Sequence, residues 1–143
     1  MQLSWNDLLI PIEAVEPANC LAPWGSIIAD RVIPVAISAF GDWFLMEKNG
    51  TIRHLCMLQG TFEMVARNQA DFQLKMNDPN WQETFLLSSL IGTLKQQGIT
   101  RSEAQCFGFQ IHPVFGGVAE SSNVVVLDLL VWNSICHQIH FRS

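Results

Sequence analysis

Residues Asp42 to Cys56 read DWFLMEKNGTIRHLC, and this stretch decides the fold. Asn49-Gly50 lies at its centre, between two runs rich in aromatic and aliphatic residues. Asn-Gly is the strongest short signal for a β-hairpin, because a type I′ turn needs positive φ at both central residues. A two-residue turn here predicts that Leu45 lies opposite His54 and that Trp43 lies opposite Cys56. Both faces of the hairpin carry apolar residues, so we expect each face to be covered.

Strand and helix patterns extend outward from this hairpin. Residues 33–40 and 61–65 are predicted strands that complete an antiparallel β-meander. Asp78-Pro79 is an N-cap followed by proline, and the apolar spacing from Trp81 to Leu94 predicts one long amphipathic helix that ends at Gly98. Two further strands and a closing helix after Asp128 follow. The prediction is an α+β fold in a single domain: an antiparallel β-meander packed with a long amphipathic helix and a C-terminal helix.

The N-terminal segment, residues 1–25, has a different character. Ser4 and Asp7 form a capping box for a short helix that Pro11 ends. Three prolines between residues 11 and 23 then predict an extended loop up to Gly25. We find no internal repeat and no linker within the chain.

The composition is that of a compact folded domain. Of the 143 residues, 49% are hydrophobic and 15% are charged, which leaves a fairly apolar surface and predicts that a partner or a homo-oligomer covers part of it. The first residues carry no base ahead of their apolar run, and no uncharged stretch is long enough to cross a bilayer. We therefore expect a cytoplasmic protein with no membrane partner. Four widely spaced cysteines predict reduced, mostly buried thiols.

The formal charge is concentrated in the first third of the chain. Up to residue 47, six acids accompany the single base Arg31, whereas from Lys48 onward acids and bases balance, so the net charge of −5 lies in this part. An acidic face repels nucleic acid and anionic membranes and attracts basic partners. A solvated surface without a binding role is the alternative explanation of the same acids.

The stretch CFGFQIHPVFGG, from Cys106 to Gly117, holds a thiol and an imidazole that could act as a nucleophile and its base. Along a strand, however, Cys106 and His112 are about 20 Å apart, so they cannot form such a pair. We expect Cys106 to be a buried core residue. His137 and His140 form a second cluster with Cys136. Their spacing does not match a helical zinc motif, and a hydrogen-bonding role at the helix end is the favoured interpretation.

Other signatures of chemistry are missing from the sequence. It contains no glycine-rich phosphate loop, no Gly-x-Ser-x-Gly elbow and no cluster of Lys or Arg. The sequence therefore predicts no catalytic residue, no cofactor, no metal site and no nucleic-acid partner.

Several short motifs occur in a characteristic order. They are Phe40-Gly41-Asp42-x-Phe44-Leu45, the Asn49-Gly50 hairpin, Cys106-Phe107-Gly108-Phe109, Pro113, Gly116-Gly117, Leu127-Asp128-Leu129 and Ser134-Ile135-x-x-Gln138-Ile139-His140. Together they resemble the C-terminal domain of bacterial type VI secretion immunity proteins that protect against DNase effectors, the Tdi-like family. The resemblance implies that residues 26–143 form a Tdi-like immunity domain. It also implies a non-catalytic cytoplasmic antidote that binds a cognate toxin, a basic nuclease, and covers its active or substrate-binding surface.

The charge pattern suggests which residues contact such a toxin. The candidate partner-binding acids are Glu13, Glu16, Asp30 and Glu47, with Trp5 or Trp24 as aromatic anchors, because interfaces favour tryptophan centres with polar rims. For the two tryptophans, covering the second face of the meander is the alternative. Two other functions stay open: an adaptor or chaperone for a secreted effector, and a thiol or metal enzyme.

Overall fold

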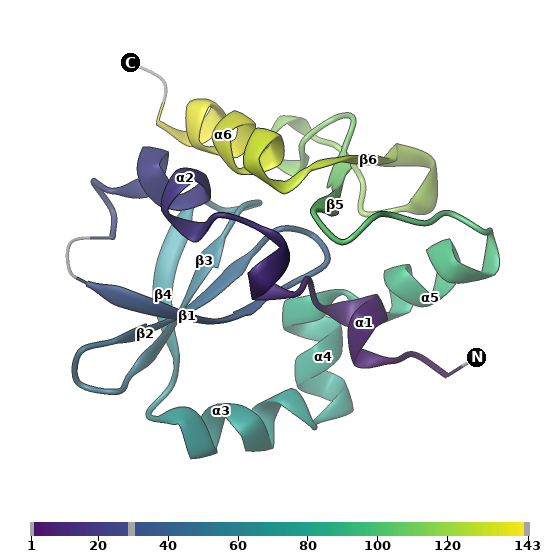
Figure 1. The fold of residues 1–143 in the computed structure, drawn as a ribbon. Coiled ribbons are helices and arrows are strands. Elements are labelled where there is room, and N and C mark those ends of the chain that lie inside the picture. The colour runs from purple at the N-terminus through teal and green to yellow at the C-terminus, as the bar shows by residue number, and fades with distance from the viewer. Residues whose placement is uncertain (1, 29–30, 142–143) are drawn as a thin grey trace.

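The computed structural model describes residues 2–28 and 31–141 (Figure 1). The helices are α1 (Trp5–Leu8), α2 (Pro17–Leu21), α3 (Gln69–Met76), α4 (Pro79–Leu86), α5 (Ser88–Gln96) and α6 (Leu129–His140). Short 3-10 helices are η1 (Ile12–Ala14), η2 (Ala22–Trp24), η3 (Pro113–Phe115) and η4 (Ser121–Asn123). The strands are β1 (Val32–Ile37), β2 (Trp43–Glu47), β3 (Ile52–Cys56), β4 (Thr61–Ala66), β5 (Gln105–Phe109) and β6 (Val124–Asp128). Within the described ranges, every helix is too short or too polar to cross a bilayer.

The four-stranded sheet lies between two layers of helices. Strands β1 to β4 pair antiparallel in sequence order, which confirms the predicted meander and the α+β class. Trp43 and Phe44 point to opposite faces, as neighbouring strand residues must. The indole nitrogen of Trp43 donates to Asn133 of α6, whereas Phe44 packs against Phe72 of α3 and Trp81 of α4. Figure 1 shows α2 and α6 above the sheet and α3 and α4 below it.

The hairpin turn has three residues and not the predicted two. The backbone nitrogen of Glu47 donates to the carbonyl of Thr51, and the backbone nitrogen of Gly50 donates to the carbonyl of Glu47. Gly50 has a φ of 90°. This is a type I turn followed by a left-handed residue, the next commonest hairpin connection. The extra residue shifts the register by one position, so Trp43 lies opposite Leu55 and not opposite Cys56. Leu45 accordingly lies opposite Arg53, and the predicted pairing with His54 is wrong.

The predicted long helix is two helices. Helix α4 ends at Leu86, and α5 begins at Ser88. Leu87 between them has a φ of 56°, the left-handed region that a bulky residue rarely adopts. The bend brings Trp81 of α4 against the sheet and lets α5 pack beside α1. No glycine or proline marks the bend, which is why helical spacing alone predicted a single element.

The N-terminal segment is helical and contributes to the core. Helix α1 has the predicted capping box, in which the Asp7 carboxylate accepts from the backbone nitrogen of Ser4 at 2.8 Å. The extended loop predicted after it is wrong, since η1, α2 and η2 take up most of residues 12–24. Proline at the first turn of a helix costs no hydrogen bond, so Pro17 can begin α2 and Pro23 can lie in the first turn of η2.

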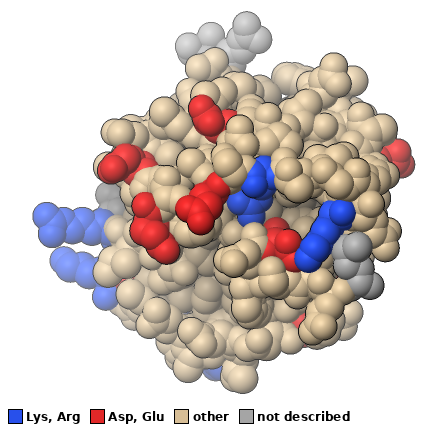
Figure 2. Space-filling view, turned by 45° about the vertical axis from the view of Figure 1, so that its right-hand side comes forward, with Lys and Arg blue, Asp and Glu red and all other residues tan. Residues whose placement is uncertain are grey.

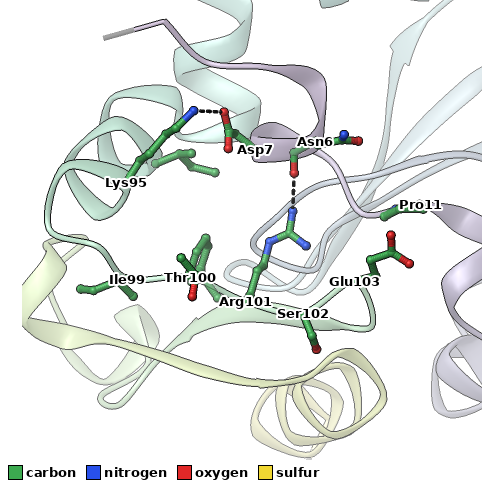
Figure 3. Close-up of a pocket in the computed structure, with 11 residues that line it drawn as sticks. Asn6, Asp7, Pro11, Lys95, Ile99, Thr100, Arg101, Ser102 and Glu103 are labelled. Carbon is green, nitrogen blue, oxygen red and sulfur yellow. Dashed lines mark hydrogen bonds and ion pairs between the residues drawn. The ribbon is translucent and has the colours of Figure 1, made fainter.

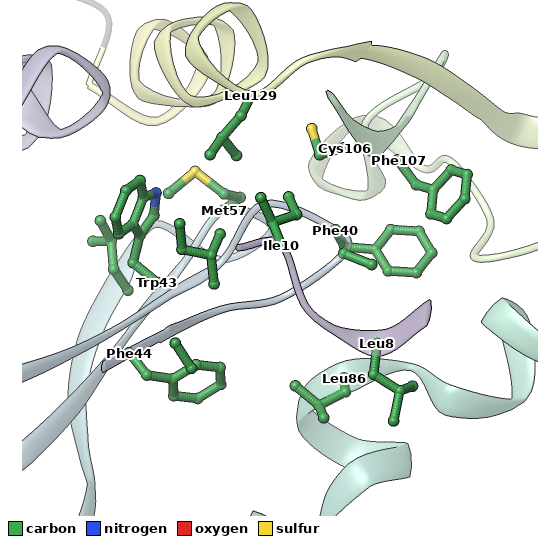
Figure 4. Close-up of a cluster of buried hydrophobic side chains, with 14 of the residues drawn as sticks. Leu8, Ile10, Phe40, Trp43, Phe44, Met57, Leu86, Cys106, Phe107 and Leu129 are labelled. Carbon is green, nitrogen blue, oxygen red and sulfur yellow. The ribbon is translucent and has the colours of Figure 1, made fainter. Parts of the chain in front are cut away.

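The second sheet consists of β5 and β6, and β6 runs directly into α6. The backbone nitrogen of Phe107 donates to the carbonyl of Ala39, which fixes this small sheet against the end of β1. One hydrophobic core joins all of these parts. Figure 4 shows Leu8, Trp43, Met57, Cys106 and Leu129, from five different segments, within that core.

Candidate functional site

The acids predicted from the sequence lie in different environments. Glu13 and Glu16 are exposed at η1 and before α2. Glu47 is partly buried and forms an ion pair with Arg53, with 2.7 Å between Oε1 and Nε. Asp30 lies outside the described residues. On the face shown in Figure 2, carboxylates gather around basic side chains, and most of the remaining surface is uncharged.

The two candidate tryptophans differ sharply in exposure. Trp5 is 44% exposed, whereas Trp24 is 0% exposed. The indole nitrogen of Trp24 donates to the carbonyl of Asn133 at 3.1 Å, and its ring packs edge-on against His137. Trp24 therefore has no exposed surface to offer a partner. Its assignment as an interface anchor is corrected, because the ring fills the space between the N-terminal segment and α6.

A pocket of ≈ 340 Å³ opens between α1, α5 and the segment before β5 (Figure 3). Lys95 and Asp7 form an ion pair across it at 2.8 Å, and this hydrogen bond lowers the pKa of the Asp7 carboxyl. Arg101 donates to the carbonyls of Asn6 and Leu9 at 3.0 Å. Burial lowers the pKa of the Arg101 guanidinium, although an arginine stays charged at neutral pH. These polar groups bond to the protein itself. The ion pair and the hydrogen bonds therefore hold the N-terminal segment in place.

Asp42, His54 and Cys56 form a cluster whose potential ligand atoms all lie within 4.8 Å of one another. The Asp42 carboxylate accepts from His54 at 2.7 Å and from the backbone nitrogen of Met57 at 2.9 Å. Burial and the nearby Asp42 charge raise the pKa of the Cys56 thiol to about 12. A thiol with this pKa stays protonated at neutral pH, so Cys56 is not an activated nucleophile. The cluster has the properties of a buried hydrogen-bond network.

The carbonyl of Met57 accepts hydrogen bonds from two histidines. The Nε2 of His112 lies 3.1 Å from this oxygen, and the Nε2 of His140 lies 2.8 Å from it. A carbonyl can only accept, so both Nε2 atoms carry hydrogens. The Nδ1 of His112 in turn accepts from the backbone nitrogen of Val114 at 3.1 Å. The predicted hydrogen-bonding role is confirmed for His140. His112 is the N-cap of η3, and its two hydrogen bonds hold this loop against the turn at Met57.

The described cysteines are buried in agreement with the sequence. Cys106 lies in β5 with no exposed surface, and burial raises the pKa of its thiol well above the ordinary value. Cys20, Cys56 and Cys136 are also buried and free of disulfides. Cys106 is a core residue, as predicted.

Exposed apolar side chains concentrate in the C-terminal third of the chain. We call seven of them the C-terminal apolar surface: Ile111, Val114, Phe115, Val118, Leu130, Val131 and Ile135. The first four lie on the loop around η3, and the other three lie on α6. Phe115 is 67% exposed, although it is among the most hydrophobic residue types. Concentrated exposed apolar residues mark interaction sites in soluble proteins.

The same part of the chain is poor in charge. From Ser102 to Phe141 the sequence has no lysine or arginine, and its acids are Glu103, Glu120 and Asp128. This bias was visible in the sequence. Which apolar residues stay exposed was not visible, because this depends on how the η3 loop and α6 pack against the rest of the protein. Sequence reasoning placed its candidate partner-binding residues in the N-terminal third and did not identify this exposed apolar surface.

Comparisons with known proteins agree with the fold and with the family resemblance of the motifs from Cys106 onward. The family model described as T6SS immunity protein Tdi1, C-terminal, matches residues 66–140, slightly more than half of the chain and all of the C-terminal apolar surface. The crystal structure of Atu4351 from Agrobacterium tumefaciens has a similar fold, with a TM-score of 0.57 and 16% sequence identity. The similarity covers 87% of this chain and 65% of that chain, so this chain spans less than two thirds of that protein's length. No curated protein matches the sequence closely enough to count as a relative.

Proposed function

This chain belongs to the family of type VI secretion immunity proteins represented by the C-terminal part of Tdi1, and from this membership we propose that it binds a cognate secreted toxin and neutralises it. We propose further that the toxin is a DNase and that the protein acts in the cytoplasm, by covering the toxin's active or substrate-binding surface. No bond is made or broken by the immunity protein in this mechanism. It acts by affinity alone.

The C-terminal apolar surface carries the proposal. Protein interfaces have an apolar centre that is depleted in charged residues and enriched in aromatic ones, and a few buried anchors supply most of the affinity. Phe115 and Val114 protrude from the loop that His112 fixes, and Leu130 and Val131 protrude from the first turn of α6. All four lie inside the range that defines the family.

The charge of the chain supports a nuclease as the target. A protein that binds DNA needs a positively charged surface, because phosphate contacts provide much of the affinity. The net charge here is −5, and Glu13, Glu16, Glu120 and Asp128 are exposed. Exposed acids and a net negative charge would accelerate association with a basic nuclease and would repel its DNA.

The test uses the toxin encoded beside this chain's gene. We expect co-expression of this chain to relieve the toxicity and the DNA degradation that the toxin causes, and the two purified proteins to form a stable complex. A wild-type protein that binds no product of the neighbouring gene and relieves no toxicity would refute the proposal. A protein needed for export of the toxin but not for survival would be a chaperone.

Variants then locate the surface. Phe115→Ser should weaken the complex at least about tenfold, the loss expected for an interface anchor. Leu74→Ser is the matched control, since Leu74 is 75% exposed on α3 and lies outside the C-terminal apolar surface. Equal affinities of the two variants for the toxin would show that the interface lies elsewhere.

A further inference from the structure

Strand β6 has an unpaired outer edge. In the small sheet β5 bonds to Ala39 on one side and to β6 on the other, and β6 pairs only with β5 among the described residues. A strand edge without a neighbour presents backbone donors and acceptors that can pair with another chain.

The register shows which backbone groups point outward. Gln110 donates to the carbonyl of Asn123, and Leu129 donates to the carbonyl of Ala104, so these two are hydrogen-bonded pairs of the β5–β6 ladder. Bonded and non-bonded pairs alternate in an antiparallel ladder. By this alternation the backbone groups of Val126 and Asp128 face away from β5. The outward bond from Phe107, the partner of Val126, to Ala39 agrees with this assignment.

Four outward groups therefore form the free edge: the carbonyl of Val124, both backbone groups of Val126 and the N–H of Asp128. No hydrogen bond to another described residue uses any of them. The carbonyl of Asp128 already belongs to the first turn of α6.

The edges of the larger sheet are interrupted along their length, whereas β6 carries its one charge, Asp128, only at its last residue. Strand β1 contains Pro34 and a register irregularity next to it, and β4 contains the exposed Glu63. Proline, charge and irregular register are the usual means of preventing unwanted strand pairing. Strand β6 reads Val-Val-Val-Leu-Asp and pairs with β5 without any irregularity.

We propose that β6 is a strand-addition site, at which an extended segment of the toxin pairs with the outer edge of β6. This inference rests on the proposed function, because it takes the toxin as the partner. Backbone bonds from an added strand give affinity, and its alternate side chains give specificity. The toxin segment presents apolar side chains and a lysine or arginine that faces the exposed Asp128.

The surroundings of β6 fit this partner. At one end, Asn123 bonds to the carbonyls of Ile111 and Val118, which places the η3 loop beside the strand. At the other end, Leu130 and Val131 follow two and three residues after Asp128. Residues of the C-terminal apolar surface thus lie near both ends of β6. A second copy of this chain offers no base from Ser102 to Phe141 to pair with Asp128, whereas a basic toxin does.

Proline substitutions test the edge without breaking the β5–β6 ladder. Asp128 has a φ of −60°, which proline also adopts, and its N–H faces outward. Asp128→Pro should therefore fold, yet it removes an edge donor and adds a ring where the toxin strand would lie. Asp128→Ser is the matched control, because it removes the same carboxylate but keeps the N–H and suits an N-cap. Val126→Pro removes the central donor in the same way.

Binding is measured by calorimetry with a catalytically inactivated form of the neighbouring toxin. We expect Asp128→Pro and Val126→Pro each to lose at least about tenfold more affinity than Asp128→Ser, since a bond is lost and the strand is displaced. Hydrogen exchange should show the amides of Val126 and Asp128 protected only in the complex. Thermal unfolding identifies any proline variant that has lost its fold, and the exchange result then decides alone.

The outcomes separate the two proposals. A wild-type protein that fails to bind the toxin refutes the proposed function. Toxin binding that resists both proline substitutions, with unprotected edge amides, refutes strand addition and leaves the proposed function standing. A wild-type dimer that either proline variant converts to a monomer, with toxin binding kept, assigns the edge to a second copy and overturns the toxin as its occupant.

Discussion

Asn133 offers the sharpest test of how the core is held together. It has no exposed surface, and its side chain joins three segments. Its Oδ1 accepts from the indole nitrogen of Trp43 at 2.7 Å, and its Nδ2 donates to the carbonyl of Gly41 at 3.0 Å. Asn133→Ala leaves a buried donor on β2 and a buried acceptor on the preceding turn without partners.

The expected cost follows from these two groups. An unsatisfied buried polar group costs about 1–3 kcal/mol, whereas alanine gains about 0.5 kcal/mol over asparagine within a helix. We therefore expect Asn133→Ala to lower the free energy of unfolding by about 2–5 kcal/mol. The assay is urea unfolding followed by tryptophan fluorescence. Ser134→Ala on the same helix is the control and should change the stability by less than about 0.5 kcal/mol.

A double-mutant cycle refines the result. Trp43→Phe removes the donor that Asn133 satisfies, so the two substitutions should cost less together than the sum of their separate effects, by at least about 0.5 kcal/mol. An Asn133→Ala variant that loses less than about 1 kcal/mol, with an additive cycle, would contradict the argument that this amide organises the core.

Three further predictions concern stability and reactivity. Gly60→Ala should destabilise the protein by about 1–3 kcal/mol more than Gly50→Ala, because both glycines have positive φ but only at Gly60 would a Cβ lie 2.6 Å from His140; a calorimetric comparison that finds equal melting temperatures would contradict this. Burial lowers the pKa of His112 below 6.5. As the pH falls, the His112 imidazole is therefore protonated at a higher pH in the unfolded chain than in the folded protein. Its contribution to stability should be complete above pH 6.5 and should be lost as the pH falls below that value, with a smaller loss in His112→Gln; identical pH profiles in urea titrations would count against it. Cys56, with a pKa of about 12, should resist a thiol reagent at pH 8 until urea unfolds the chain, and rapid labelling of this residue in the native protein would show otherwise.

The sequence predicted most elements of the fold because their signals are local. Asp78 accepts a hydrogen bond as an N-cap, as its residue type indicated. The meander, β5, β6 and α6 were predicted from strand-like runs or from helical spacing, and the structure confirms them. The register of the hairpin was wrong, because Asn49-Gly50 suits both a two-residue and a three-residue loop, and one residue moves every cross-strand pair.

Other features depend on tertiary packing and have no local signal. Leu87 adopts a left-handed conformation that its residue type disfavours, and the packing of α4 and α5 on either side compensates for the strain. Trp24 is buried because α6, more than a hundred residues later, supplies the acceptor for its indole. The N-terminal acids were visible in the sequence, whereas the C-terminal apolar surface depends on which side of each element faces the core.

The carbonyl of Met57, which accepts from both His112 and His140, affects how tightly the C-terminal apolar surface can bind a partner. One turn of the meander holds both the loop that displays Phe115 and the helix that displays Val131, through His112 and His140. The loop and the helix are therefore held in fixed relative positions, and in the proposed complex this arrangement would exist before the toxin binds. Ordering an interface side chain or loop on binding costs about 0.5–1.5 kcal/mol for each immobilised group. A preorganised loop avoids much of this entropic loss, so complexes of this protein should dissociate slowly.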